Sequence, residues 1–306
     1  MDNLLLAAAC LLAGLALRIS GRLPQEADRA LAGVVIHVSA PAVAFLAARA
    51  MPLTPEVLLP GSMAWVVFAG GALFFGLAAR LMGLSRQTFG CLMLTGGLCN
   101  TIFIGLPMTE AFFGHEYSYI PFLCDNPGTS LVLALPGVLL ASHLSGAAKG
   151  SLGQRLRQSL WRVVSFPPFV GMVLGLALRP VAPPDWVLSA ISRVGGTTVP
   201  LSLLAVGMGI RLRAPGKAWK PLALGLAYKL ALAPALMWLV AAGLWRSTGP
   251  VAQVTVFGAA MPPMILGAIL ATDHGLDPDL AGLLVAAGTA LSFLTLPLWR
   301  LALNWM

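Results

Sequence analysis

Apolar residues follow one another in long stretches along this chain, and polar residues interrupt them only briefly. Ten stretches can be separated, each a candidate membrane helix: residues 3–17, 30–48, 61–83, 88–113, 119–142, 163–179, 187–210, 220–245, 250–272 and 279–300. A bilayer core about 30 Å thick needs roughly 20 helical residues, so the first and sixth stretches are short for a full crossing. The pattern predicts an all-α membrane protein with ten transmembrane helices.

The fourth and ninth stretches contain residues that interrupt a helix. In the fourth, Gly96-Gly97 and Pro107 flank the polar pair Asn100-Thr101, and in the ninth Met261 is followed by Pro262-Pro263. A break in hydrocarbon leaves backbone N–H and C=O groups without partners, which is tolerated where protein or a water-filled cavity surrounds it. For one helix alone, a simple proline kink would be the better explanation. Two breaks favour a substrate site between crossing half-helices, whose N-terminal ends suit a carboxylate.

The two breaks also lie at equivalent places in an internal repeat. Gly14-Leu15-Ala16-Leu17-Arg18 recurs as Gly175-Leu176-Ala177-Leu178-Arg179, an offset of 161 residues. The same offset relates three further pairs of landmarks: Gly114 and Gly275, Pro136 and Pro297, and Asn100-Thr101 and Met261-Pro262. Each repeat holds five stretches, an odd number, so the copies must cross the membrane in opposite senses. We therefore expect inverted five-helix repeats at 1–143 and 163–306, joined by a basic cytoplasmic linker at 144–162.

Composition and charge support a membrane location and predict its orientation. Of 306 residues, 58% are hydrophobic and 10% are charged, unlike a water-soluble domain. The net charge of +8 does not indicate a nucleic-acid partner, because Lys and Arg stand in short segments between the apolar stretches. One set of segments carries thirteen basic residues and the other carries four, Arg49, Arg179, Arg246 and Arg300. The positive-inside rule then predicts a multi-pass protein of the inner (plasma) membrane, with the first set in the cytoplasm and both termini outside.

Ionisable side chains inside the stretches are costly and therefore candidates for function, and three of them are considered as site residues. Asp125, beside Asn126, could bind a coupling cation or carry a proton, and an ion pair within the helix bundle is an equally good explanation. Lys229 could be the partner in that pair, or it could attract the anion. His37 could titrate near neutral pH, although a hydrogen-bonded structural histidine is the simpler explanation.

Signatures of enzymes and of metal sites are missing from the sequence. It holds no His-Glu-x-x-His, no Gly-x-x-x-x-Gly-Lys-Ser/Thr and no Gly-x-Ser-x-Gly. The four cysteines lie in apolar stretches without Cys-x-x-Cys spacing, so we expect free thiols. The acidic and histidine residues at 273–279 are expected to form a solvated loop with helix caps. We therefore expect no enzyme and no bound cofactor or metal, with H⁺ or Na⁺ as a possible coupling ion.

The run Asn100-Thr101-Ile102-Phe103-Ile104-Gly105-Leu106-Pro107, followed by Ala111-Phe112-Phe113-Gly114, resembles the fourth-helix signature of the auxin efflux carrier family. That family includes bacterial permeases for malonate, malate and similar acids. Three further features resemble the family: Asp125-Asn126, the run Pro200–Leu204 before a basic loop, and the Met261-Pro262 break. The resemblance covers essentially the whole chain.

The resemblance implies a five-plus-five inverted repeat related to the bile-acid symporters. Spans 1, 2, 6 and 7 would form a scaffold, and spans 3–5 and 8–10 a mobile domain that transports by an elevator movement. Asn100, Thr101 and Pro107 would line the substrate site, with Met261, Pro262 and Pro263 opposite, and Asp125 and Asn126 behind. Family members usually have a small or polar residue where Pro263 stands. A homodimer formed through the scaffold is also implied.

These observations predict a secondary transporter of small organic-acid anions that works by alternating access. Two other functions stay open from the sequence. One is a Na⁺-coupled carrier of larger amphipathic anions, as in the bile-acid symporters. The other is a membrane sensor that binds a ligand without moving it.

Overall fold

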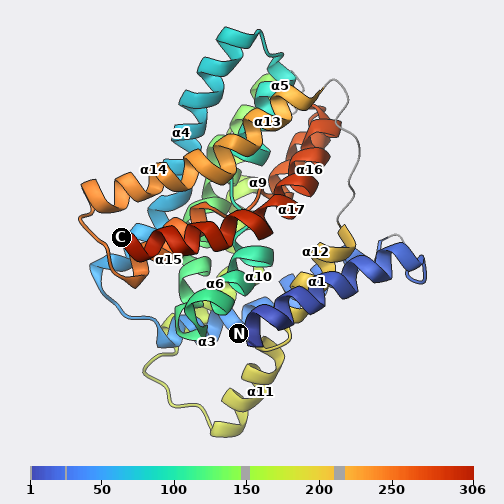
Figure 1. The fold of residues 1–306 in the computed structure, drawn as a ribbon. Helices are drawn as coiled ribbons and strands as arrows, with labels where there is room; N and C mark the ends of the chain where they lie inside the picture. The colour runs from blue at the N-terminus through green and yellow to red at the C-terminus, as the bar shows by residue number, and fades with distance from the viewer. Residues whose placement is uncertain (1, 25, 146–151, 210–217) are drawn as a thin grey trace. The chain divides into compact units, whose positions relative to one another are not determined.

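The computed structural model describes residues 2–24, 26–145, 152–209 and 218–306 (Figure 1). These residues form helices joined by short connections, and apart from one antiparallel bridge between Cys99 and Pro263 they contain no β-structure. Six helical segments are long and apolar enough to span a membrane: Ala27–Ala50, Pro55–Met82, His115–Ser145, Asp185–Gly209, Trp219–Leu244 and Pro278–Trp305. The all-α membrane fold is thus confirmed.

Four shorter apolar helices complete the pattern of stretches. They are Leu5–Ser20, Thr101–Phe113, Pro167–Ala177 and Pro250–Ala259. They fall in the first, fourth, sixth and ninth stretches, which are the two predicted to be short and the two predicted to be broken. Of the basic residues behind the predicted orientation, Lys149, Arg211, Arg213 and Lys217 lie outside the described part of the chain, as does 146–151 of the linker.

The chain folds into two compact units, each assembled from three separate stretches. Unit 1 comprises Met1–Val57, Ile102–Leu123 and Val164–Ile210, and unit 2 comprises Leu58–Thr101, Cys124–Val163 and Arg211–Met306. Both units therefore combine residues from the first and second halves of the sequence. The division into scaffold and mobile domains, and that into two sequence repeats, stay predictions.

Unit 1 contains eight α-helices and three shorter helical turns. They are α1 (Asp2–Ser20), α2 (Ala27–Val34), η1 (Val35–Ser39), α3 (Ala40–Ala50), η2 (Pro55–Val57), α6 (Leu106–Phe113), η5 (His115–Tyr117), α7 (Tyr119–Leu123), α10 (Pro167–Ala177), α11 (Asp185–Gly195) and α12 (Thr198–Gly209). Two close helix pairs, α1 with α12 and α3 with α10, hold this unit together. In Figure 1, α1 and α12 run side by side.

Glycines allow both helix pairs to approach closely. Gly14 of α1 faces the backbone carbonyl of Leu204, and Gly207 of α12 faces that of Leu11, so a β-carbon at either glycine would collide with backbone. In the other pair, Gly175 of α10 faces the carbonyl of Phe45 in the same way. Membrane helices associate through small residues because lipid offers no hydrophobic gain for larger ones.

Two arginines join the ends of α3 and α10 reciprocally. The guanidinium of Arg49 donates to the carbonyls of Leu178 and, at 2.8 Å, Val181, and that of Arg179 donates to the carbonyl of Met51 at 2.9 Å. The last carbonyls of a helix lack intrahelical partners and carry partial negative charge. These basic residues therefore cap helix ends, which explains two of the four on the sparsely charged side of the predicted topology.

Unit 2 contains both helix breaks and the longest intact helices of the described residues. Its elements are α4 (Leu58–Met82), α5 (Arg86–Cys91), η3 (Leu92–Gly96), η6 (Cys124–Ser130), η7 (Leu133–Gly137), α8 (Val138–Ser145), α9 (Leu152–Val164), α13 (Trp219–Ala227), η9 (Tyr228–Leu232), α14 (Ala233–Leu239), η10 (Val240–Leu244), α15 (Pro250–Ala259), α16 (Ile265–Asp273), α17 (Pro278–Ala302) and η11 (Leu303–Trp305). Asp277, within the predicted loop-and-cap segment 273–279, caps α17 by accepting from the Leu280 N–H at 3.4 Å. The helix η4 (Thr101–Gly105) begins at the last residue of one stretch of this unit.

Wide helical turns occur beside prolines in both units. The π-type turns η6 and η7 contain Pro127 and Pro136, and η1, η4 and η9 each end just before a helix with proline in its first turn. Proline lacks an N–H and clashes with the preceding turn. A local wide turn lets the freed carbonyls find other partners inside a membrane helix.

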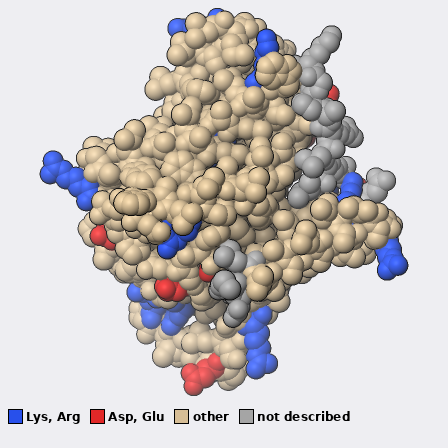
Figure 2. Space-filling view, in the orientation of Figure 1, with Lys and Arg blue, Asp and Glu red and all other residues tan. Residues whose placement is uncertain are grey.

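The outer face of the helices is apolar. On α4, Leu73, Leu77 and Leu81 are 78%, 59% and 76% exposed, and Leu294 and Leu298 of α17 are 68% and 64% exposed. On the face drawn in Figure 2, charged side chains are few and stand apart on a largely uncharged surface. Water would oppose such exposure, whereas lipid accepts it, so the surface fits a multi-pass membrane protein.

Candidate functional site

Both predicted helix breaks are present in unit 2. The first helix ends at Gly96, where the N–H of Gly97 donates to the carbonyls of Leu92 and Met93 at 3.0 and 3.1 Å, and η4 starts at Thr101. The second helix, α15, ends at Ala259, and α16 starts at Ile265. The chain between these helix ends is non-helical and buried.

The two interrupted segments pair with each other. The N–H of Asn100 donates to the carbonyl of Pro262 at 3.0 Å, and the N–H of Met264 donates to the carbonyl of Thr95 at 3.1 Å. Pro262 and Pro263 have no N–H to leave unpaired, which explains why prolines suit a break in a buried place. The pairing supplies hydrogen-bond partners for some of the backbone N–H and C=O groups that two broken helices expose. It leaves the helix ends available to bind a ligand.

Half-helix ends of both signs meet at this crossing, which we define as residues 95–101 and 259–265. The helices η4 and α16 begin there, and η3 and α15 end there. Met264, at the N-cap of α16, has no side-chain oxygen with which to cap the helix. The side chain of Asn100 is buried, and among the described residues its Nδ2 has no hydrogen-bond partner. A buried amide donor beside helix N-termini favours an anion.

Asp125 lies behind the crossing and is held by two hydroxyl groups. Thr101 Oγ1 donates to one carboxyl oxygen at 2.6 Å, and Ser130 Oγ donates to the other at 3.1 Å. The adjacent Asn126 is also buried. Among the residues that the structure describes, Asp125 forms no ion pair. The alternative of an Asp125–Lys229 pair is therefore not what this structure shows, and the crossing connects to the carboxyl group through Thr101.

Lys229 reaches the crossing from η9. Its side chain is fully buried, and its Nζ donates to the carbonyl of Ala259 at 2.5 Å and to the sulfur of Cys99 at 3.1 Å. Cys99 stands directly before Asn100, and Ala259 is the last residue of α15. A positive group is thus fixed at the C-terminal end of one half-helix.

Pro107 and His37, the two remaining predicted site residues, belong to unit 1. Pro107 is buried in the first turn of α6. His37 is exposed in η1, and its Nδ1 lies 2.9 Å from the carbonyl of Gly33 on the same helix. That contact matches the structural role considered for His37. The predicted roles of these two residues in binding and coupling stay predictions.

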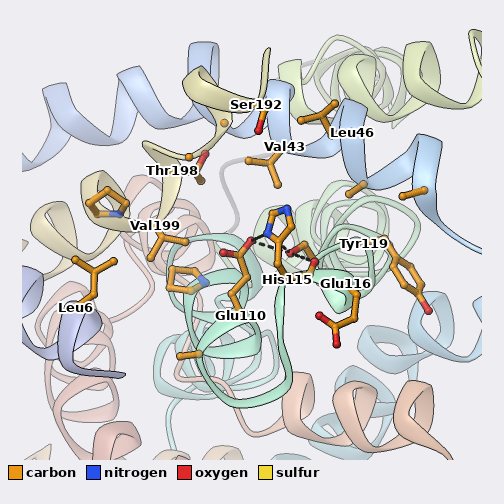
Figure 3. Close-up of a pocket in the computed structure, with 18 residues that line it drawn as sticks. Leu6, Val43, Leu46, Glu110, His115, Glu116, Tyr119, Ser192, Thr198 and Val199 are labelled. Carbon is orange, nitrogen blue, oxygen red and sulfur yellow. Dashed lines mark hydrogen bonds and ion pairs between the residues drawn. The ribbon is translucent and has the colours of Figure 1, made fainter. Parts of the chain in front are cut away.

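Pro107 lines a cavity of about 510 Å³ within unit 1 (Figure 3). Glu110 and His115 lie side by side in it, with Leu6 and Val199 on one side and Tyr119 on the other. Glu110 accepts from Ser118 Oγ at 2.7 Å and lies 3.0 Å from His115 Nδ1. The described lining residues include two glutamates but no Lys or Arg. This charge disfavours a carboxylate ligand, so the crossing is the better candidate anion site.

Three residues in or beside the crossing escaped the sequence analysis. The carbonyl of Thr95 accepts from the Met264 N–H, and the buried Thr95 hydroxyl has no partner among the described residues. The sulfur of Cys99 accepts from Lys229. The hydroxyl of Ser130 donates to Asp125. Thr95 stands one residue before the Gly96-Gly97 pair, and this proximity to a helix breaker was the available signal. The contacts of Cys99 and Ser130 depend on which helices meet, which one sequence does not reveal.

Comparisons with known proteins agree with this architecture. The sequence profile of the family described as "Membrane transport protein" matches residues 151–300. An uncharacterized transporter of Methanothermobacter thermautotrophicus is 31% identical over 300 residues, which cover 95% of this chain and 94% of that protein. An uncharacterized transporter of Methanocaldococcus jannaschii is 25% identical over 311 residues, covering 98% of this chain and 97% of that protein.

Proposed function

Because the chain belongs to the membrane transport protein family of the auxin efflux carriers, we propose that it is a secondary transporter of small organic-acid anions. The family and the apolar helices identify a multi-pass membrane transport protein rather than an enzyme. The carboxylate substrate is our inference from the site.

The Nδ2 of Asn100, which has no hydrogen-bond partner in the described parts of the chain, is the observation that carries this proposal. It is a buried donor at a point where the helices η4 and α16 begin. A carboxylate oxygen would accept from the amide and lie against two helix N-termini. Lys229 adds positive charge to the same crossing. The same groups would repel an organic cation.

We further propose that ten helices form two inverted repeats and that transport follows an elevator movement. The helix pairs of unit 1 support the repeat. The recurring Gly-Leu-Ala-Leu-Arg run lies in α1 and at the C-terminal end of α10, and Gly14 and Gly175 each face a backbone carbonyl of the partner helix. Equivalent residues thus perform equivalent packing in the two halves. A homodimer in the plasma membrane, with both termini outside, belongs to the same proposal.

The energy source depends on the direction of transport. Moving one negative charge outward gains about 2.3 kcal/mol per 100 mV of membrane potential, which is enough to drive efflux without a coupled ion. Uptake requires a coupled cation. Asp125 supports proton coupling, because its carboxyl group touches Thr101 of the crossing and would report substrate occupancy there.

Counterflow in proteoliposomes tests the function. Vesicles are loaded with a panel of mono- and dicarboxylates, and exchange of labelled substrate is measured with and without a H⁺ or Na⁺ gradient. We expect Asn100→Ala to weaken substrate binding about 10- to 100-fold, since a hydrogen bond to a charged group contributes about 1.5–3 kcal/mol. Asn304→Ala, which removes an exposed amide, is the matched control.

Two outcomes would contradict the proposal. If the folded, inserted protein exchanges no carboxylate, transport of small organic acids is excluded, and binding without flux would identify a sensor. If folded Asn100→Ala binds as tightly as the wild type, the substrate site lies elsewhere.

A further inference from the structure

We propose that the Nζ of Lys229 is a tethered cation that occupies the position where a coupling metal cation would bind at the crossing, so that transport requires no Na⁺. This inference rests on the proposed transport of organic anions. It concerns a different question at the same crossing, namely which group balances the partial negative charge at the C-terminal ends of the half-helices.

The geometry places the lysine at a cation position. Ala259 is the last residue of α15, and its carbonyl accepts from Lys229 Nζ at 2.5 Å. The final carbonyls of a helix carry about half a negative charge and have no intrahelical partner. In transporters with broken helices, such carbonyls coordinate Na⁺ or H⁺. Here the chain itself supplies the positive group.

The lysine is fixed in this position by both of its neighbours. Tyr228 donates its hydroxyl to the carbonyl of Val67 on α4, and the carbonyl of Leu230 accepts from the indole of Trp299 on α17 at 2.8 Å. Tyr228 also packs against the rings of Phe74 and Phe75. Because η9 is attached on both sides, Nζ is held at the crossing and the side chain is fully buried.

The remaining surroundings of Nζ do not suit a metal ion. Its second contact is the sulfur of Cys99, and that sulfur lies 3.7 Å from the sulfur of Met63. Na⁺ is a hard cation, and hard cations select oxygen ligands over sulfur. An ammonium group needs only acceptors for its three hydrogens, and a carbonyl with a soft sulfur meets that need.

The charge of Lys229 also has no carboxylate partner. Within the described parts of the chain, the ion pairs are Arg29 with Glu26 and His115 with Glu110. A buried ammonium without a counter-charge is costly, and the bound organic anion would supply that counter-charge. Anion and lysine then occupy opposite helix ends of one crossing, the anion at the N-termini and the ammonium at a C-terminus.

Exchange in proteoliposomes with Na⁺ replaced by choline tests the first half of this inference. We expect the wild type to exchange its carboxylate at the same rate in both media. We expect the exchange rate of Lys229→Ala to fall at least tenfold in choline and to recover when methylammonium is added, since an ammonium group suits the carbonyl and sulfur that Nζ contacts, whereas Na⁺ and Li⁺ should restore little. Lys220→Ala, an exposed lysine on α13, should behave as the wild type throughout.

A second measurement needs no substrate. The thermal midpoint of detergent-purified Lys229→Ala should rise with methylammonium chloride and not with NaCl or choline chloride, whereas the wild type should respond to none of them. If Lys229→Ala does not fold, Lys229→Met is compared in the same way, and its apolar side chain should weaken exchange without recovery by cations.

The outcomes separate this inference from the proposed function. Wild-type exchange that stops in choline would overturn the tethered cation while confirming transport. Undiminished exchange by Lys229→Ala in choline would overturn it as well. Failure of the wild type to exchange any carboxylate in either medium would contradict the proposed function, and the salt response of the thermal midpoint would still decide whether Lys229 occupies a cation place.

Discussion

Thr101 is the residue at which the crossing and the buried carboxyl group meet. Its N–H donates to the carbonyl of Cys99 at 3.1 Å, and its hydroxyl donates to Asp125 at 2.6 Å. It is also the first residue of η4, and the dipole at a helix N-terminus favours an anion. A change in how Asp125 is protonated would therefore reach the proposed substrate site through the Thr101 side chain.

We expect Thr101→Val to impair the protein without changing its shape. Valine has nearly the same volume but cannot donate, so Asp125 keeps only the bond from Ser130. Loss of a buried hydrogen bond costs about 1–2 kcal/mol, and the thermal midpoint and carboxylate exchange should both fall. Thr255→Val is the control, because the Thr255 hydroxyl bonds the carbonyl of Val251 on its own helix. Equal loss in both variants would contradict a special role for Thr101.

At the scale of helices, glycine contacts decide which pairs form. Gly175 lies against the carbonyl of Phe45 and near the β-carbon of Ala48, whereas Gly282 of α17 has open space where a β-carbon would stand. The same residue type therefore permits close approach in one helix and is merely flexible in the other. The arginine caps of α3 and α10 act at the ends of the pair that Gly175 joins.

Gly175→Ala and Gly282→Ala should change stability in opposite directions. The methyl group at 175 meets backbone that cannot move aside, and overpacking of this kind costs about 1–3 kcal/mol. At 282 the methyl group meets nothing, and alanine stabilises a helix interior by about 0.5–1 kcal/mol. Thermal unfolding of the two purified variants, followed by tryptophan fluorescence, checks the difference. A stabilised Gly175→Ala would show that α3 and α10 are not in close contact in the membrane.

At the scale of the whole molecule, patterns that depend on short segments could be predicted from the sequence. The apolar stretches matched the helices because burial in lipid requires long apolar runs, and the breaks fell at Gly96-Gly97 and Pro262-Pro263 because these residues oppose helix continuation. The hydrogen-bond partner of Lys229 could not be predicted. It is a backbone carbonyl of α15, and every residue has such a carbonyl, so the sequence does not show which one lies near the lysine. The cavity beside Pro107 brings together six α-helices and η5 from distant parts of the chain, and its acidic character appears only once they are assembled.

The orientation in the membrane stays a prediction, and single cysteines test it. In a background with the four native cysteines replaced, Asn304→Cys near the C-terminus and Arg157→Cys on α9 introduce exposed thiols. Positive-inside counting predicts that a membrane-impermeant maleimide labels Asn304→Cys in intact cells and labels Arg157→Cys only after permeabilisation. The reverse pattern would invert the topology and place both termini in the cytoplasm.

The pairing of α1 with α12 also constrains how the protein is synthesised. The partner that covers Gly14 comes from the second half of the chain, and ribosomes add about 5–20 residues per second. During synthesis the glycine face of α1 is therefore without α12 for on the order of ten seconds or more. In that time only lipid or other proteins can lie beside it. We expect the nascent chain to be most vulnerable to membrane proteases in that interval, and to depend then on an insertion factor that the finished protein no longer needs.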